Sequence, residues 1–247
     1  MKVVYSEEYQ QVYSYDPASN PGRIESIAFA LSGKVDYIEP RPASEEDIAA
    51  VHTPRHIAEV RREGVYDIAA LAAGGAALAA EIGLSEPCFA VIRPPGHHAS
   101  ADTAWGFCYF NNMAIALTKL KKKDKIKKAF ILDFDLHVGD GNINILGPKG
   151  YVTILNPGGQ DRNEYLKTVH NALEKTDADM IAVSAGFDNH EADWGGLLKT
   201  EDYTAMGQWV AEAARRNKGG SFGILEGGYN HAVLGNNVRA FIEGLSG

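Results

Sequence analysis

Three carboxylates and one imidazole follow a short apolar stretch within eight residues: Asp133, Asp135, His137 and Asp140. Asp135 and His137 are two positions apart, so in extended chain their side chains point the same way. An oxygen ligand and a nitrogen ligand side by side are what a divalent metal such as zinc requires. Taken alone, the segment also fits a strand that runs into a polar turn closed by glycines. The other polar groups of the chain decide between the two interpretations.

Three further apolar stretches also end in side chains suited to catalysis. They are Phe89–Ile92 before His97 and His98, Met180–Ser184 before Asp188 and Asp193, and Ser221–Leu225 before Glu226 and Tyr229. Ligands of open parallel sheets bind beyond the carboxyl ends of the strands. We therefore expect these polar groups, together with Asp135 and His137, to meet at one site.

The elements that must position these groups alternate between strand-like and helix-like patterns. Predicted strands cover 3–5, 35–38, 89–92, 129–134, 151–155, 180–184 and 221–225, and predicted helices begin near Ser44 or cover 65–82, 161–175, 200–216 and 232–245. Several strands are continuous apolar runs, as expected for a sheet buried on both faces. The alternation predicts an α/β fold with a mostly parallel sheet. A length of 247 residues fits one domain that spans 1–247.

Composition narrows the function classes. The formal net charge is −8, which argues against a broad basic surface for nucleic acid. The lysine-rich run 119–128 reads as the solvated end of a helix. Cys88 and Cys108 form no disulfide framework and read as buried thiols of a reducing compartment. With no signal-peptide pattern and no membrane-length apolar run, we expect a cytoplasmic protein.

Taken together and in this order, the motifs resemble those of the metal-dependent deacetylases, the superfamily of histone deacetylases, acetylpolyamine amidohydrolases and acetoin-utilization proteins. The matching segments are Arg93–Ala99, Gly106–Asn112, Asp133–Gly141, Ser184–Asp188 with Asp193, and Glu226–Asn230. The resemblance implies a three-layer α/β/α fold, related to arginase, around the mostly parallel sheet.

The resemblance implies a metal site made by Asp135, His137 and Asp193. Such a set leaves coordination positions open for water and substrate. Zn²⁺ is the expected cofactor, and Fe²⁺ also suits oxygen-rich ligands. The family further implies a structural K⁺ near Asp133, Asp135 and His137.

The resemblance also assigns catalytic roles. His97 and His98 would be the acid–base pair, with Asp133 orienting His97 and Asp140 orienting His98. Tyr229 would donate a hydrogen bond to the developing oxyanion. Gly106 and Phe107 would line a narrow slot for the substrate chain.

The chain also departs from the family pattern. Val138 stands where many members have a second histidine, and Asn20-Pro21-Gly22 replaces a His-Pro-Glu segment. The chain is short for the family, and the segments 56–66 and 156–160 lack room for long rim loops. We therefore expect a wide, shallow mouth without a second aromatic wall, and loose substrate selectivity.

The leading hypothesis is hydrolysis of an acetylated amine to acetate and free amine. Acetyl-lysine in a peptide, an acetylpolyamine and a small acetamide all fit as substrates, and the oligomeric state is open. Two alternatives remain. One is an arginase-like dinuclear metal hydrolase, and the other is a deacetylase-like binding module with little turnover.

Overall fold

The computed structural model describes residues 1–247 and contains one seven-stranded sheet in which every neighbouring pair of strands is parallel. The strand order is β2-β1-β3-β7-β6-β4-β5. The strands are β1 Lys2–Val4, β2 Asp36–Ile38, β3 Cys88–Ala90, β4 Ala129–Asp133, β5 Val152–Leu155, β6 Met180–Ala185 and β7 Gly220–Leu225. The predicted α/β fold with a parallel central sheet is confirmed.

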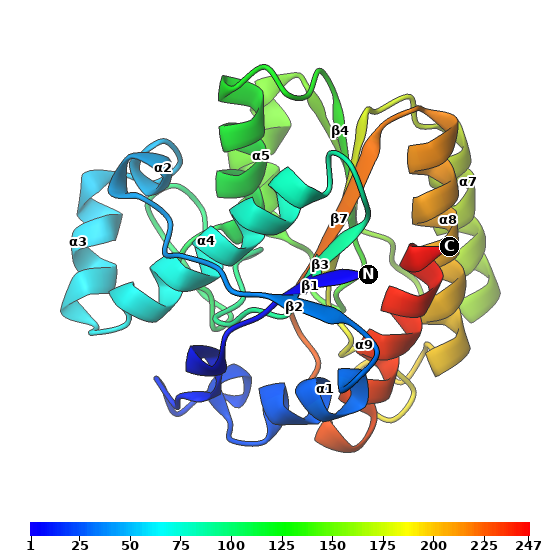
Figure 1. Ribbon diagram of the computed structural model, residues 1–247, viewed down its shortest axis with the longest axis horizontal. Helices are drawn as coiled ribbons and strands as arrows, with labels where there is room; N and C mark the ends of the chain where they lie inside the picture. The colour runs from blue at the N-terminus through cyan, green and yellow to red at the C-terminus, as the bar shows by residue number, and fades with distance from the viewer.

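Helices cover both faces of the sheet (Figure 1). The α-helices are α1 Arg23–Leu31, α2 Glu45–Ala49, α3 Pro54–Arg62, α4 Tyr66–Ile82, α5 Asn112–Lys122, α6 Asp140–Leu146, α7 Arg162–Lys175, α8 Thr200–Arg216 and α9 His231–Ser246, with 3₁₀ turns at Glu7–Gln10, Pro17–Ser19 and Gly147–Lys149. Helices α4 and α5 pack together on one face, whereas α7, α8, α9 and α1 form a contiguous layer on the other.

The four strands that precede the polar groups are consecutive neighbours in the sheet. Asp133, Ser184, Ile224 and Ala90 pair in turn across β4, β6, β7 and β3. Every residue of these four strands is buried, as expected for central strands of a parallel sheet. Their carboxyl ends therefore open onto one place at the sheet edge.

Small residues bring α4 close to its neighbours. A Cβ atom added at Gly74 would lie 1.9 Å from the carbonyl oxygen of Arg41, and one at Gly75 would lie 2.8 Å from the Tyr9 hydroxyl. Glycine leaves room for such backbone approaches. The Ala- and Gly-rich helix predicted over 65–82 thus forms as α4, with small residues at its contacts.

The structure adds helices that the sequence patterns did not indicate. Helices α1 and α6 begin after Gly22 and Gly139, and neither N-cap makes a side-chain hydrogen bond, so the usual start signal is absent. Helix α3 does carry such a signal, because the Thr53 hydroxyl accepts a hydrogen bond from the His56 N–H and Pro54 opens the helix.

Two fully buried arginines tie distant segments together. The Arg93 guanidinium donates hydrogen bonds to backbone carbonyls of the amino-terminal segment, those of Tyr9, Gln11, Ala18 and Asn20. The Arg23 guanidinium donates to the carbonyls of Glu226 and Gly228, at 2.5 and 2.8 Å. Because an unpaired buried charge is costly, these contacts fix the segments that follow β3 and β7.

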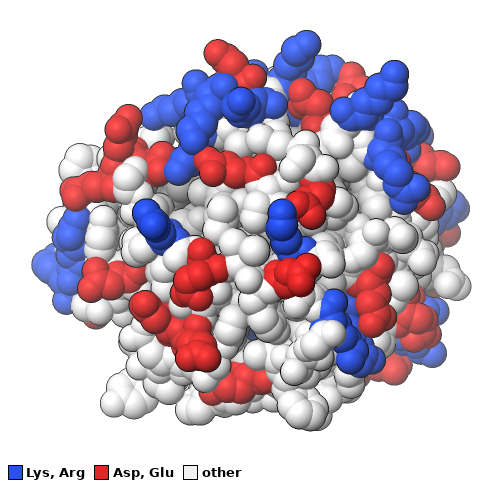
Figure 2. Space-filling view, in the orientation of Figure 1, with Lys and Arg blue, Asp and Glu red and all other residues white.

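Charged side chains are mixed over the surface. On the face shown in Figure 2, Lys and Arg side chains are interspersed with Asp and Glu. Cys88 and Cys108 are both buried and free. None of the helices has both the length and the apolar character needed to cross a bilayer.

Candidate active site

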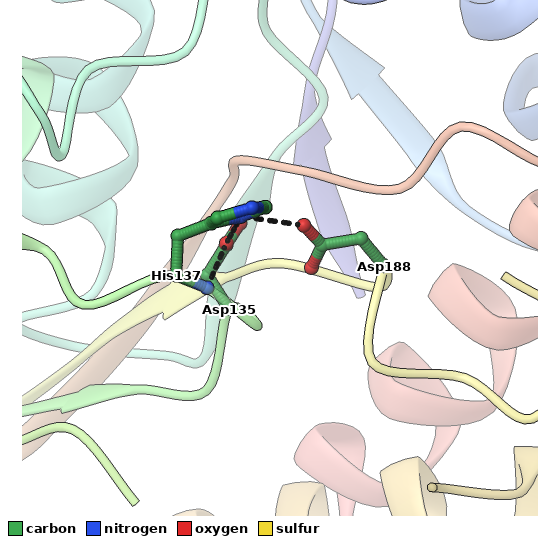
Figure 3. A group of neighbouring side chains, drawn as sticks. All are labelled: Asp135, His137 and Asp188. Atoms are coloured by element: carbon green, nitrogen blue, oxygen red, sulfur yellow. Dashed lines mark hydrogen bonds and ion pairs between the residues drawn. The ribbon is translucent and has the colours of Figure 1, made fainter. Parts of the chain in front are cut away.

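Asp135, His137 and Asp188 form a compact cluster beyond the ends of β4 and β6 (Figure 3). One potential ligand atom from each residue lies within 4.8 Å of the others. His137 Nδ1 lies 3.2 Å from Asp135 Oδ1 and 3.1 Å from Asp188 Oδ2. Both carboxylates are buried, whereas the imidazole is partly exposed. An imidazole nitrogen and two carboxylate oxygens facing one point are a donor set suited to a divalent cation.

Glycines make the space that the two carboxylates occupy. A Cβ atom at Gly186 would lie 2.0 Å from Asp135 Oδ2. One at Gly227 would lie 2.5 Å from the same oxygen and 2.8 Å from Asp188 Oδ2. Asp188 Oδ2 is buried and accepts no hydrogen bond of good geometry; its close neighbour is His137 Nδ1 at 3.1 Å. Since buried carboxylate oxygens need compensation, two carboxylates that face one imidazole fit a cation-binding group better than a polar turn.

Neighbouring charges perturb the protonation of the cluster. Burial, together with the charge of Asp135, raises the pKa of Asp188 to about 6. Burial opposes ionisation of Asp135 as well, but His97 and the hydrogen bonds from His137 and Gly227 lower its pKa below the usual value. Close contact with the two carboxylates raises the pKa of His137 to about 10. The cluster thus favours a positive charge between the two carboxylates.

Asp193, the expected third ligand, lies outside this cluster. Its carboxylate accepts hydrogen bonds from three backbone N–H groups, those of Trp194, Tyr229 and Asn230. The segment after Asp188 folds back on itself, with Asn189 O accepting from Leu198 N–H, and this reversal separates the two aspartates. The group of side chains that could hold a metal ion thus contains Asp188 in the place where Asp193 was expected. The available signal was distance along the chain, because β6 ends at Ala185 and Asp188 follows it more closely than Asp193 does.

Two adjacent histidines of the loop after β3 each face a carboxylate. His97 Nδ1 lies 3.2 Å from Asp133 Oδ2, and His98 Nδ1 lies 2.7 Å from Asp140 Oδ1. His97 Nε2 lies 3.8 Å from Asp135 Oδ2, so the pair adjoins the cluster. These are the partners that the family resemblance implies.

The environments of the two imidazoles differ. Burial alone would lower the pKa of His97, but the charges of Asp133 and Asp135 raise it well above the usual value. Burial and the charge of His97 lower the pKa of His98 to about 4. Pairs of groups whose pKa values are pushed apart are typical of acid–base sites.

Glu226 supports the loop after β3 that carries His97 and His98, hereafter the histidine loop. The sequence analysis did not assign this role to Glu226. Its Oε2 accepts hydrogen bonds from the backbone N–H groups of Gly96, at 2.7 Å, and His97, at 3.2 Å. Burial is the main cause that raises its pKa, to about 7. The end of β7 thus holds the loop that follows β3.

A cavity of about 280 Å³ opens onto these groups. Gly106 and Phe107 lie at its wall with φ of 61° and 68°, a left-handed turn. A Cβ atom at Gly106 would lie 2.3 Å from His98 Cδ2, so only glycine fits there. The ring of Tyr229 meets that of Phe107 edge to face, with centroids 5.8 Å apart. Burial raises the pKa of Tyr229 and keeps its hydroxyl protonated.

Comparison with known proteins decides the family. A family model described as the histone deacetylase domain matches residues 62–156 and 149–245 of the chain. The chain belongs to the histone deacetylase family. The family resemblance predicted from the motifs is thereby confirmed.

Relatives from archaea and bacteria align over most of the chain. A probable deacetylase of Methanothermobacter thermautotrophicus is 30% identical, and the alignment covers 100% of this chain and 91% of the relative. A probable deacetylase of Archaeoglobus fulgidus is 32% identical over 92% of this chain and 81% of the relative. A histone deacetylase-like amidohydrolase of Pseudomonas aeruginosa is 28% identical over 88% of this chain and 72% of the relative. These names support a hydrolase.

The fold agrees with a solved member of the family. The crystal structure of the HDA15 HD domain superposes with a TM-score of 0.84 at 25% identity, covering 99% of this chain and 88% of that one. The alignment with the Methanothermobacter deacetylase spans 304 positions, whereas the chain has 247 residues. This histone deacetylase family member therefore lacks residues that the Methanothermobacter relative has within the aligned region.

Two tryptophans line the cavity, and the sequence analysis did not single them out. The Trp105 ring lies against His98, with centroids 3.8 Å apart, and its Nε1–H donates to Asp140 Oδ2 at 2.9 Å. Trp194 stacks on Tyr229 with centroids 4.1 Å apart and planes at 26°.

The shortened segment 157–160, where the second aromatic wall was expected to be missing, does not line this cavity but a neighbouring hollow. The expectation that a second aromatic wall is missing is thus revised, because Trp194 lines the same cavity as Phe107.

Proposed function

We propose that this histone deacetylase family member is a metal-dependent amidohydrolase that converts an acetylated amine into acetate and the free amine. One observation carries the proposal: the Asp135–His137–Asp188 cluster adjoins both histidine–carboxylate pairs beside a single cavity. Family membership supports the hydrolase class.

The cluster would hold one divalent cation. The donor set of one imidazole nitrogen and two carboxylates suits Zn²⁺, and Fe²⁺ is the alternative that the same donors accept. When bound, the cation polarises the amide carbonyl and lowers the pKa of water. Asp133 Oδ1 is buried without a hydrogen-bond partner, which supports the further proposal of a structural K⁺ beside it.

The two histidines would move the protons. His98, the neutral member of the pair, accepts a proton from the attacking water while Asp140 holds its other nitrogen. His97, held by Asp133, stays protonated and adds positive charge beside the reacting carbonyl. The hydroxide part of water adds to the carbonyl carbon, the carbon–nitrogen bond breaks, and the amine nitrogen takes up the proton from His98.

Tyr229 would stabilise the tetrahedral oxyanion. Its hydroxyl stays protonated because burial raises its pKa, so it can donate a hydrogen bond. Gly228 precedes it with a φ of 113°, and the Arg23 guanidinium, 5.4 Å from the ring centroid, holds that loop. Donors placed in advance for a developing charge are a large source of rate acceleration.

The proposal is tested by acetate release from protein loaded with Zn²⁺ or Fe²⁺. The substrates are an acetyl-lysine peptide, N-acetylputrescine and an N-alkylacetamide, and the metal content of each preparation is measured. We expect one divalent metal per chain and acetate release that a chelator abolishes. The variants Tyr229→Phe and His98→Ala should retain the metal and lose most of the activity.

Each contrary result points to a specific alternative. Two tightly bound metals per chain would favour an arginase-like dinuclear hydrolase. Metal and acetyl-ligand binding without acetate release would favour a binding module. Equal rates in the wild type and in both variants would overturn the assigned roles.

A further inference from the structure

Trp194 is placed where it would contact the chain of a bound substrate. It lines the cavity, is 52% exposed, and stacks with one face on Tyr229. Its ring meets that of His137 at 90° with centroids 6.1 Å apart, so it lies beside one residue of the metal-binding cluster. The backbone N–H groups of Trp194 and Tyr229 both donate hydrogen bonds to the Asp193 carboxylate. The backbone that carries the indole is therefore held in place before any ligand arrives, and the ring itself rests on Tyr229.

The cavity and its mouth offer apolar surface and no free carboxylate. None of the ten lining residues is Asp, Glu, Lys or Arg. Asp140, the carboxylate next to Trp105, already has both oxygens engaged by His98 and Trp105.

A cationic chain end would be poorly accommodated at this mouth. An ammonium group that leaves water needs acceptors to replace its hydration, and the carboxylates nearby are committed to other groups. An alkyl or aryl chain, in contrast, gains by covering Trp194 and Phe107.

We propose that Trp194 forms the wall opposite the histidine loop and selects acetylated amines whose chain is uncharged and apolar over those that carry a second ammonium group. The proposal rests on the proposed hydrolase function and names the substrate class of that site. It replaces the expectation of loose selectivity.

The experiment uses two substrates of equal shape, N-pentylacetamide and N-acetylputrescine, which differ by a terminal methyl against a terminal ammonium group. N-methylacetamide serves as the substrate without a chain. Acetate release is measured for the metal-loaded wild type, for Trp194→Leu, and for Trp209→Phe as a control on α8 beside His170. Ligand binding is followed separately by the change in tryptophan fluorescence.

We expect the wild type and Trp209→Phe to favour N-pentylacetamide by about tenfold or more in kcat/KM. Trp194→Leu should reduce that preference through KM, because kcat/KM should fall further for N-pentylacetamide than for N-methylacetamide. It should also weaken the fluorescence response to N-pentylacetamide, with Trp105 as the remaining tryptophan of the cavity. A preference for N-acetylputrescine in the wild type, or equal losses for all three substrates in Trp194→Leu, would overturn the proposal. If no substrate is cleaved, the hydrolase function fails, and the fluorescence response alone then decides whether Trp194 selects the apolar ligand.

Discussion

Asp193 Oδ2 accepts a hydrogen bond from the backbone N–H of Tyr229 at 2.8 Å. The same oxygen accepts from the N–H of Asn230 at 2.7 Å, and Asn230 Nδ2 donates to the carbonyl of Ala192. The loop after β6 and the loop after β7 are thus fastened to each other at the residue proposed to stabilise the oxyanion. Asp193 acts on backbone, whereas Asp188 faces His137.

This difference predicts opposite phenotypes for the two aspartates. Asp188→Asn should lose most of the bound divalent metal, because it removes a charged donor of the cluster. Asp193→Ala should keep one metal per chain but lose about 1–3 kcal/mol of unfolding free energy, since three backbone N–H groups lose a charged acceptor. Metal analysis of the dialysed proteins and denaturant unfolding measure the two effects. Loss of metal only in Asp193→Ala would restore the ligand set first expected from the sequence.

Tyr229→Phe should lower kcat by about 10²–10³ with little change in KM, as expected for a donor that acts mainly on the developing charge. Because the ring contacts with Phe107 and Trp194 do not need the hydroxyl, the melting temperature should stay the same. Steady-state kinetics and thermal unfolding check both statements. A rise in KM at unchanged kcat would show that the hydroxyl serves binding only.

Trp105→Phe should lower kcat several-fold and leave metal content unchanged. The substitution removes the N–H that holds Asp140 Oδ2 but retains an aromatic ring against His98, so the Asp140–His98 pair loses one restraint. Such partners of a catalytic histidine typically contribute tenfold or more. The kinetics of Trp105→Phe are compared with those of Trp105→His, whose ring can donate a hydrogen bond. Equal activity of Trp105→Phe and the wild type would contradict this role.

His52 should make the protein less stable in acid. Burial, together with the charge of His56, lowers the pKa of His52 to about 3, and its Nε2 accepts a hydrogen bond from the N–H of Asn111. Because the unfolded chain takes up a proton near pH 6.5 and the folded chain does not, stability is full above that pH and falls as the pH decreases toward 3. The loss from this group should reach about 2 kcal/mol at pH 5.

Denaturant unfolding of chelator-treated protein between pH 7.5 and 5 measures this loss without a contribution from metal release. His52→Gln keeps an acceptor and cannot take up the proton, so its stability should depend less on pH over the same range. Parallel pH profiles for the two proteins would show that His52 does not carry the effect.

The sheet and the location of the site could be anticipated, because fully buried strands leave continuous apolar runs and polar residues follow them directly. The strand order β3-β7-β6-β4 could not be anticipated from the sequence, since it depends on how the helices connect one strand to the next. The choice between Asp188 and Asp193 failed for a related reason. Both aspartates lie in one polar segment, and although Asp188 is the nearer of the two to β6, the reversal of the chain before Leu198 decides which of them faces His137.

The tryptophans were missed for a different reason. Trp105 and Trp194 lie in irregular segments and are about half exposed, so neither hydrophobic periodicity nor a motif marks them. Their role depends on three-dimensional neighbours, namely His98 and Tyr229. Helix α6 was missed because Gly139 offers no capping side chain.

The contacts of Arg93 and Glu226 have a consequence for synthesis on the ribosome. Arg93 binds the carbonyls of Tyr9 and Asn20, and Glu226 binds the N–H groups of Gly96 and His97. The histidine loop is therefore braced from both extremes of the chain. A nascent polypeptide would expose an incompletely braced histidine loop until Glu226 has been translated. A fragment that lacks either the segment of Tyr9 and Asn20 or that of Glu226 would not reproduce the site.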